Sequence, residues 1–362
     1  MTVLIFSFLV SLIATLLIVK SAGRHAALSA DHDLSGPQKF HTRPVPRIGG
    51  VSIFAALVAT AALLALASHH DTRWLWLLML CSLPAFVSGL AEDLTKNVSP
   101  RRRLLFTAIS AVLGIWLLDA VIRRTGLPGL ETLVAWAPFA MVLTVFMVSG
   151  VANAVNIIDG FNGLASMCVM MMLGALAYVA FQVGDQFVAT AALITLGAVL
   201  GFFVWNFPAG LIFLGDGGAY LLGFVFGELS VLLIARNQDV SPLFPILLCA
   251  YPIFETVFSI YRKKFLRGMS PGIPDGVHLH MLVYKRLMRW TLGSSARQKT
   301  VRNSMTSPYL WLLCLLSVIP AVLYWNSTAW LAAYCLLFVF AYVLLYWSIV
   351  RFRAPKWLVV RR

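Results

Sequence analysis

The stretch NAVNIIDGFNGL (residues 153–164) lies between two long apolar runs. Asn153, Asn156 and Asp159 are spaced at i, i+3 and i+6, so on a helix they would share one broad face. The Asp-Gly dipeptide that follows is a turn signal, and Gly163 lets the backbone approach another group closely. Polar groups near lipid are costly to keep, which indicates a function for this stretch. An alternative is a solvated loop whose polar side chains only satisfy the backbone.

Composition identifies the surroundings of this stretch as a membrane. The chain has 362 residues, of which 60% are hydrophobic and only 12% are charged, whereas soluble proteins carry about 25% charged residues. Apolar runs long enough to cross a bilayer recur from end to end, which predicts an all-α polytopic membrane protein. The first run, residues 3–19, follows no basic residue and precedes no A-x-A-like site, so we expect it to be a span and not a cleaved signal peptide.

The distribution of basic residues predicts the topology. We expect about eleven spans, at roughly 3–19, 49–67, 73–91, 104–122, 133–151, 162–181, 187–205, 213–234, 243–261, 309–325 and 329–350. If the loop after the first span is cytoplasmic, 24 of the 28 Lys and Arg residues fall on the cytoplasmic side. The positive-inside rule therefore predicts an N-terminus outside and a C-terminus inside. The net charge of +14 then reflects topology and anionic lipid, and we expect no nucleic-acid partner.

The same alternation places the polar segments on one face. We expect residues 1–350 to form a single multi-span domain and residues 351–362 to form a basic cytoplasmic tail. The active face would be built from the cytoplasmic loops 20–48, 92–103, 152–161, 206–218 and 262–308. The five cysteines all lie in apolar runs and are far apart in the sequence, so we interpret them as small buried hydrophobic residues.

Two further polar segments precede the central stretch. In HTRPVPRIGG (residues 41–50), the prolines predict an extended entry, and the exposed N–H groups of Gly49-Gly50 beside Arg43 and Arg47 would make an anion site. An alternative is a rigid basic turn that contacts lipid phosphates. The acidic pair Glu92-Asp93 lies at the exit of the third span, close to a basic run. Two such carboxylates suit Mg²⁺, which completes its octahedron with water and phosphate, although acids at a helix exit can also be merely solvated.

Two more segments follow the central stretch. Asp216 lies in a GDGG turn where the eighth span begins, and the flanking glycines would let a ligand or helix come close. His278 and His280 would share a side only if the chain is locally extended. A zinc site would need further nitrogen or sulfur ligands, and no cysteine is near in the sequence, so we expect these histidines to face a diphosphate. Glu255 lies two helical turns from Arg262, which makes an internal pair plausible, whereas Glu228 has no obvious partner.

In order along the chain, PVPRIGG, GLAEDL, NAVNIIDGFNGL, GDGG and PDGVHLH resemble the polyprenyl-phosphate N-acetylhexosamine-1-phosphate transferases of the WecA/MraY type, glycosyltransferase family 4. The resemblance covers about residues 1–350. It implies a bacterial inner-membrane enzyme whose active site is cytoplasmic and whose cofactor is Mg²⁺, with Mn²⁺ as an alternative. Undecaprenyl phosphate would attack a UDP-N-acetylhexosamine, with GlcNAc as the expected sugar, and UMP would leave. Such a reaction begins a cell-envelope glycan such as O-antigen, and a homodimer would fit the family.

The resemblance also implies roles for individual residues. Asp93 and Asp216 are the expected metal ligands, and Glu92, Asp93, Asp159 and His278 are the expected catalytic residues. The residues expected to bind substrate are Arg47, Lys96, Asn153, Asn156, Asn206 and His280. The physics agrees, because this transfer depends mainly on positioning and on neutralising phosphate charge.

Two departures from the family pattern stand out. The acidic pair is usually Asp-Asp and here is Glu92-Asp93, and the second acid of the usual DGxDGL is here Asn162. The HLHM segment also lacks a histidine common in the family, so a MurNAc-pentapeptide donor is less expected than a simple N-acetylhexosamine. A transporter or lipid flippase is the alternative from another class, but it would place its polar sites near the bilayer midplane. A basic scaffold that binds anionic lipid would explain the charge but not the Asn/Asp spacing.

Overall fold

The computed structural model describes residues 1–29, 44–67, 72–270, 272, 276–288 and 296–352, and every regular element within them is helical. The helices of the first half are α1 Thr2–Lys20, α2 Ala22–Ser29, α3 Gly49–Leu66, α4 Thr72–Thr95, α5 Pro100–Leu118, α6 Leu130–Val134 and α7 Ala137–Ile158. Those of the second half are α8 Leu164–Gln182, α9 Gln186–Asn206, α10 Gly215–Arg236, α11 Leu243–Leu248, α12 Ala250–Tyr261, η1 Arg262–Leu266, α13 Leu279–Leu282, η2 Val283–Leu287, α14 Ala296–Leu323 and α15 Thr328–Val350.

The predicted all-α polytopic architecture is confirmed. In the described part of the chain, nine helices are long and apolar enough to cross a membrane. They match nine of the eleven predicted spans, and the other two predicted spans fall on α5 and on the pair α11 and α12. The first turn of α5 carries three arginines, Arg101 to Arg103. The number eleven and the orientation in the membrane stay predictions.

The span predicted over residues 243–261 is divided in two. Helix α11 ends at Leu248 and α12 begins at Ala250, with Cys249 between them. Pro252 explains the break, because proline lacks an N–H and its ring would clash with the carbonyl four residues earlier, that of Leu248. A hydropathy pattern does not report such a break, since the apolar composition continues through it.

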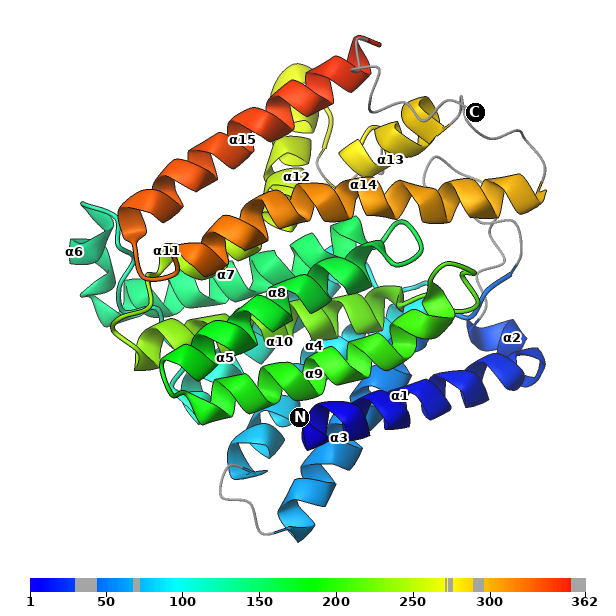
Figure 1. Cartoon of the computed structure of the whole chain (residues 1–362), viewed down its shortest axis with the longest axis horizontal. Coiled ribbons are helices and arrows are strands. Elements are labelled where there is room, and N and C mark those ends of the chain that lie inside the picture. Colours follow the sequence, from blue (N-terminus) through cyan, green and yellow to red (C-terminus); the bar gives the residue numbers. More distant parts are fainter. Residues whose placement is uncertain (30–43, 68–71, 271, 273–275, 289–295, 353–362) are drawn as a thin grey trace.

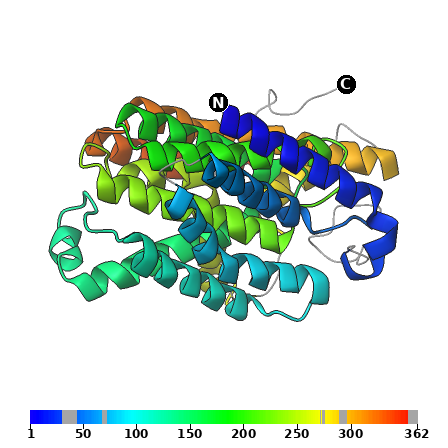
Figure 2. The ribbon, with the colours of Figure 1, turned by 90° about the horizontal axis from the view of Figure 1, so that it is seen from below.

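Helix α10 lies at the centre of the bundle. It packs against α3, α4, α5, α7, α8 and α9 and is almost wholly buried, whereas α1 and α15 bury few of their side chains. Helices α1 and α15 lie at the outside of the bundle (Figure 1), and α1 is again on the outside in Figure 2. Glycines on α10 permit this close packing. A Cβ at Gly223 would lie 2.5 Å from the Cα of Ala152 on α7, so a larger residue there would push the two helices apart. The beginning of α10 is thereby held next to the end of α7.

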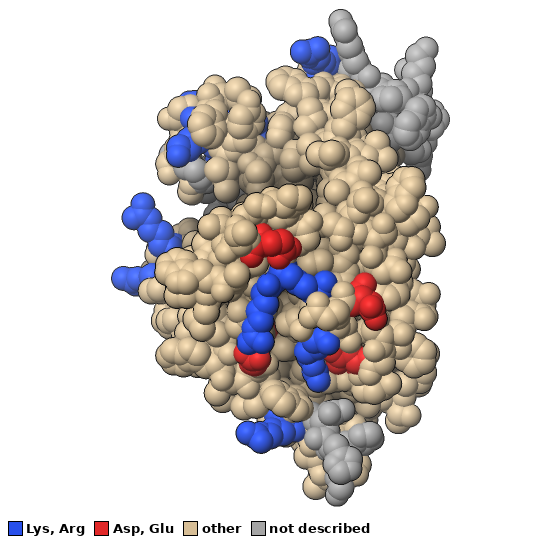
Figure 3. Space-filling model, turned by 90° about the vertical axis from the view of Figure 1, so that its left-hand side faces the viewer, with Lys and Arg blue, Asp and Glu red and all other residues tan. Residues whose placement is uncertain are grey.

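The two ends of the bundle differ in charge. Figure 3 shows the end at which α6 lies, where acidic and basic side chains are interspersed. Asp119 pairs with Arg123 at 2.6 Å, and Asp185 lies 3.6 Å from Arg236. Where α4 ends, α5 starts with three arginines, Arg101 to Arg103. The end of the bundle at which α4 and α7 finish therefore carries a cluster of basic residues.

Candidate active site

A polar cavity of about 380 Å³ opens at this basic end. It lies where α4 and α7 end and where α10 begins. The segment before α3 meets the histidine segment there (residues 276–282, around His278 and His280). Eight residues predicted for the site line it: Arg47, Glu92, Asn156, Asp159, Asn206, Asp216, His278 and His280. Asp93, Lys96 and Asn153 are the predicted site residues that do not. Segments more than 230 residues apart in the sequence therefore meet at one cavity.

Asp216, in the first turn of α10, is the centre of the charged contacts in this cavity. Its carboxylate accepts a hydrogen bond from Asn156 Nδ2 at 3.1 Å and lies 3.4 Å from Arg47 Nη2. Arg103, at the start of α5, also pairs with this carboxylate, and its guanidinium lies 5.8 Å from the ring centroid of Tyr220. Arg103 also lines the cavity; it belongs to the basic run after the acidic pair and was not among the predicted site residues.

Asp93 holds the beginning of α10. The side chain is 1% exposed, and its two oxygens accept the backbone N–H groups of Asp216 at 3.0 Å and Gly217 at 2.9 Å. A carboxylate at a helix N-terminus satisfies N–H groups that lack partners within the helix and complements the helix dipole. Arg47 Nε lies 3.7 Å from the same carboxylate. The geometry thus assigns Asp93 a positioning role beside Asp216, and its predicted metal role stays a prediction.

The PVPRIGG segment positions Arg47 by backbone pairing. The carbonyl of Pro46 accepts the N–H of Phe213, and the N–H groups of Gly49 and Gly50 donate to the carbonyls of Phe213 and Leu214. The anion site predicted at Gly49-Gly50 is therefore wrong, because both N–H groups are already used in the fold. The glycines serve instead for close approach, since a Cβ at Gly50 would clash with the backbone of Gly218. His41 and Arg43 lie outside the described residues.

In the central stretch, α7 ends at Ile158, and the chain turns through Asp159 and Gly160. Asn153 and Asn156 both face α10, since Tyr220 donates its hydroxyl to Asn153 Oδ1 at 3.3 Å and Asn156 bonds Asp216. Burial raises the pKa of Asp159 to about 7, against the opposing effect of the Arg47 charge. A carboxyl group with such a pKa in a polar cavity is typical of functional sites.

Two asparagines of the site hold loops in place through hydrogen bonds of their side chains. Asn206, predicted to bind substrate, accepts the N–H of Gly163 at 2.6 Å and donates to the carbonyl of Ile212 at 2.7 Å. Asn162 donates to Pro208 O and Ser304 Oγ, and its backbone N–H donates to Asn303 Oδ1. Both residues line the cavity. Their hydrogen bonds join the central stretch to the loop before α10 and to α14.

The histidine segment is extended at His278, which has φ −61° and ψ 152° and precedes α13. The two histidine rings stack at a centroid distance of 5.2 Å, as expected for an extended backbone. Nδ1 of His278 lies 2.9 Å from Glu255 Oε1. The pair expected between Glu255 and Arg262 is not the one that forms, because Arg262 turns to Val277 O and to the Tyr346 hydroxyl. Asp275 lies outside the described residues.

Two predicted residues near the exit of α4 differ in position. Glu92 lines the cavity, and its Oε2 accepts the N–H of Val98 at 2.7 Å. Lys96 is exposed in the turn after α4, where its φ of 57° reverses the chain. The predicted substrate role of Lys96 therefore has no support from the cavity lining.

The donor set suits a magnesium ion better than a zinc ion. Among the described residues, no group of three His, Cys, Asp or Glu side chains is arranged to hold a metal. Mg²⁺ does not need such a cage, because it binds one or two carboxylates and keeps water and substrate phosphate as its other ligands. Asp216 and Asp159 supply carboxylate oxygens at the polar cavity, so the residues present fit this requirement.

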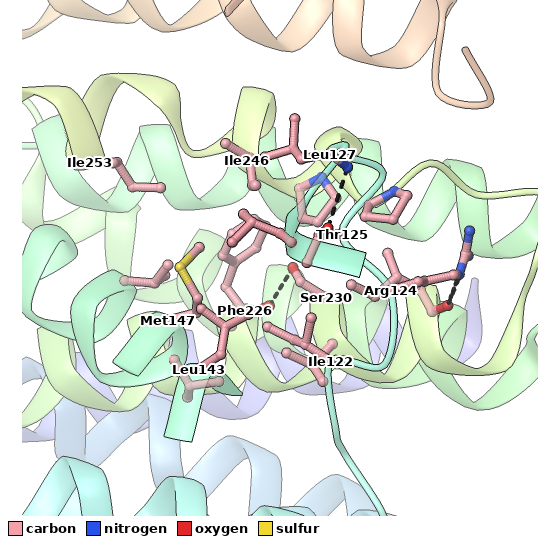
Figure 4. A pocket seen from close by; sticks show the side chains of 18 residues that line it. Ile122, Arg124, Thr125, Leu127, Leu143, Met147, Phe226, Ser230, Ile246 and Ile253 are labelled. Atoms are coloured by element: carbon pink, nitrogen blue, oxygen red, sulfur yellow. Dashed lines mark hydrogen bonds between the residues drawn. The ribbon is translucent and has the colours of Figure 1, made fainter. Parts of the chain in front are cut away.

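A second cavity, of about 200 Å³, is almost entirely apolar. It lies between α7, α10 and α11, and Figure 4 shows Met147, Phe226 and Ile246 around it. Its lining extends along α7 from Leu143 to Val151. Asn156 follows Val151 by five positions, which corresponds to about 7.5 Å along a helix axis. The apolar cavity thus approaches the polar one along a single helix.

The comparisons with known proteins agree with these findings. Residues 75–234 match the model of glycosyl transferase family 4. A "Probable undecaprenyl-phosphate N-acetylglucosaminyl 1-phosphate transferase" of Bacillus subtilis is 28% identical over 91% of this chain and 87% of its own. An "Undecaprenyl-phosphate alpha-N-acetylglucosaminyl 1-phosphate transferase" of Thermotoga maritima is 29% identical over 71% and 74%, respectively. A "Phospho-N-acetylmuramoyl-pentapeptide-transferase" of Oceanobacillus iheyensis is 30% identical over 55% and 64%.

Proposed function

Because the chain belongs to glycosyl transferase family 4, we propose that it transfers GlcNAc 1-phosphate from UDP-GlcNAc to undecaprenyl phosphate. An oxygen of the acceptor phosphate forms a bond to the β-phosphorus of the donor. The bond from that phosphorus to the oxygen bridging the two phosphates breaks, and UMP leaves. GlcNAc is favoured as the sugar because the relatives named for it align with 91% and 71% of the chain, against 55% for a relative named for the MurNAc-pentapeptide.

The observation that carries the proposal is the charge arrangement at Asp216. One carboxylate, an amide and two guanidinium groups meet in a polar cavity at the basic end of a multi-pass membrane protein. Phosphoryl transfer needs little covalent chemistry from the protein and much positioning and charge neutralisation. A soluble nucleotide would enter this cavity from the cytoplasm, while the acceptor phosphate would reach it from the bilayer.

Asp216 and Asp159 would hold Mg²⁺, which neutralises the diphosphate of the donor when bound. Asn156 orients the Asp216 carboxylate, and Asp93 fixes the start of α10 on which Asp216 lies. Arg47 and Arg103 would contact donor phosphates, because guanidinium groups bind phosphate oxygens with two donors at once. His278 and His280, which also line the cavity, would contact the diphosphate through their ring nitrogens. The acceptor needs no strong general base, since the second pKa of a phosphate monoester is about 6.

The apolar cavity suits the isoprenoid chain of the acceptor. Its lining is apolar except for a few groups such as Thr125, Ser230 and Arg124, and the side chain of Arg124 caps α10 by donating to Ile234 O, Asn237 O and Val240 O. Burial of an apolar chain contributes about 0.8 kcal/mol per CH₂ group, so even a short buried section would anchor the acceptor. Helix α7 would then contact the isoprenoid chain through Met147 in the apolar cavity and face the phosphates through Asn156 in the polar cavity.

One assay tests the proposal directly. The purified protein is given undecaprenyl phosphate, labelled UDP-GlcNAc and Mg²⁺, and both lipid-linked label and UMP are measured. We expect both products in equal amounts, and loss of turnover when EDTA removes the metal. UDP-GalNAc and UDP-MurNAc-pentapeptide serve as competing donors. Preference for the pentapeptide donor would contradict the GlcNAc assignment, and no turnover of any of the three would contradict the function.

A further inference from the structure

Glu255 is a carboxylate buried in the interior, at a position outside the part of the chain that matches the family model. It lies on α12 with 1% of its surface exposed and accepts three hydrogen bonds. Oε1 receives the N–H of Leu279 at 3.0 Å and bonds His278 Nδ1 at 2.9 Å, while Oε2 receives the Tyr342 hydroxyl at 2.8 Å. A buried carboxylate with so complete a set of partners is fixed in position.

We propose that Glu255 is the positioning residue for His278 in the transfer reaction, and that Tyr342 orients Glu255 in turn. The inference rests on the proposed function, because it assigns the histidine a ligand in the polar cavity. With Nδ1 bonded to Glu255, His278 can meet a phosphate oxygen only through Nε2. A carboxylate partner at one ring nitrogen sets the orientation of the ring and stabilises its positive charge, which a phosphate ligand requires.

The same carboxylate also sets the backbone of the segment. Oε1 holds the N–H of Leu279, the residue between the two histidines, so the start of α13 cannot rotate without breaking that bond. The rings of His278 and His280 stack at an interplanar angle of 10°, so fixing the orientation of His278 also restricts that of His280. His280 in turn packs edge-on against Phe161 at a centroid distance of 5.7 Å, beside the Asp159 turn.

Helix α15 helps to hold Glu255 and the histidine segment through two tyrosine hydroxyls. The Tyr342 hydroxyl reaches Glu255, and the Tyr346 hydroxyl one turn later accepts a hydrogen bond from Arg262 at 3.0 Å. Arg262 also donates to the carbonyl of Val277, next to His278, at 2.9 Å. The C-terminal helix thereby fixes the histidine segment through two separate side chains.

The titratable groups around the pair come from the histidine segment, α12, η1 and α15. The described groups that face Glu255 are His278 and His280 of the histidine segment, Tyr251 of its own helix and Tyr342 of α15, while Arg262 follows at the end of α12. Glu255 supplies the negative charge of this set. Its removal should therefore disfavour the cationic form of His278 and leave the phosphate side of the cavity with less positive charge.

The test compares Glu255→Gln, His278→Ala and the double variant in the transferase assay. The glutamine keeps an acceptor for Leu279 and His278 but removes the charge. We expect Glu255→Gln to lower kcat/KM by about ten- to a hundredfold, as for other residues that orient a functional histidine. The alkaline fall of kcat/KM should also move to lower pH. In the His278→Ala background, the same substitution should cause little further loss, because it acts through the histidine.

Glu228→Gln is the matched control, since Glu228 is also a fully buried carboxyl, lies on α10 and does not line the polar cavity. We expect it to leave kcat/KM and the pH profile unchanged. Tyr342→Phe should also lower kcat/KM, but by a smaller factor than Glu255→Gln. Thermal unfolding of each variant separates loss of fold from loss of activity.

Two results would overturn the inference while wild-type turnover still upholds the function. One is a Glu255→Gln variant with the wild-type pH profile and kcat/KM. The other is a loss in the double variant equal to the product of the two single losses, which would indicate a purely structural role. An inactive wild-type protein would instead contradict the proposed function itself.

Discussion

At Asp216, the amide of Asn156 and the guanidinium groups of Arg47 and Arg103 all contact one carboxylate. The roles proposed for the metal ion and the donor phosphates follow from this arrangement. Without substrate, Arg47 and Arg103 neutralise the aspartate. When a metal ion and a diphosphate are bound, the aspartate would take the metal and the arginines would take the phosphates. The neighbouring guanidinium groups thus limit the cost of keeping an acid in this partly buried position.

The first prediction concerns this carboxylate. Asp216→Asn should lower kcat by a hundredfold or more, about the loss caused by removing one electrostatic group from an active site. The fold should persist, because Asp93 bonds the backbone N–H of residue 216 and not its side chain. Asp119→Asn, at the other end of the bundle, is the control and should retain activity. Retained turnover in Asp216→Asn would remove this residue from the metal site.

The raised pKa of Asp159 predicts a dependence of stability on pH. Burial raises this pKa from 3.8 to about 7, so the folded protein binds the proton more tightly than the unfolded chain. Its contribution to stability is therefore complete at low pH and is lost as the pH rises from about 4 to about 7. Because asparagine does not titrate, Asp159→Asn should remove this loss of stability at higher pH.

The measurement is the difference in unfolding temperature between Asp159→Asn and wild type without metal. It should favour the variant more strongly at pH 8 than at pH 5, where only part of the loss has occurred, although the variant should lose transferase activity. Mg²⁺ should raise the unfolding temperature of the wild type more at pH 8 than at pH 5, because it competes with the proton. An equal difference at both pH values would contradict the raised pKa.

At the scale of elements, the site depends on how helix ends are joined. Asn162 joins the end of α7 to α14 and to the loop before α10, and the Ser307 hydroxyl donates to its backbone carbonyl at 2.6 Å. This explains why an amide can replace the acid that is usual in the family at this position. A carboxylate there could not donate to Pro208 O or Ser304 Oγ.

We therefore expect Asn162→Asp to reduce activity, although it restores the family pattern. Leaving buried groups without their hydrogen bonds costs about 1–3 kcal/mol each, so the unfolding temperature should also fall. Ser307→Ala removes one bond of the same network and should have a smaller effect on both quantities. Increased turnover in Asn162→Asp would show instead that the acid acts directly in catalysis.

Helix α7 joins the two cavities, and this yields a prediction about the acceptor. Met147→Trp should fill part of the apolar cavity and raise KM for undecaprenyl phosphate, while KM for UDP-GlcNAc stays the same. A short-chain acceptor, such as geranyl phosphate, should show little change in KM between the variant and the wild type. Equal increases in KM for the long and short acceptors would contradict the assignment of this cavity to the isoprenoid chain.

At the scale of the whole molecule, the charges indicate how the bundle lies in the membrane. Acidic and basic residues are interspersed at the α6 end, and the basic excess lies at the cavity end. This distribution supports a cytoplasmic cavity, as the positive-inside rule requires. A nucleotide sugar made in the cytoplasm could then enter without crossing the bilayer.

Cysteine labelling tests this orientation. Asn97 lies in the exposed turn between α4 and α5, and Thr132 is exposed on α6. Single cysteines at the two positions should react from opposite sides, position 132 in intact cells and position 97 only after the membrane is opened. Four of the five native cysteines are buried and the fifth is partly buried, so they should give little background. Labelling of both positions in intact cells would contradict the topology.

Sequence alone determined the membrane class, the approximate spans and most of the polar residues that line the cavity. Apolar run length and the spacing of Asn153, Asn156 and Asp159 are local properties that a chain carries in any fold. Only the tertiary structure decided that Gly49-Gly50 pairs with the backbone, that Arg103 meets Asp216 and that Glu255 bonds His278. These contacts join residues 23 to 164 positions apart, and hydrogen-bond partners at such separations depend on how helices pack, which no local pattern encodes.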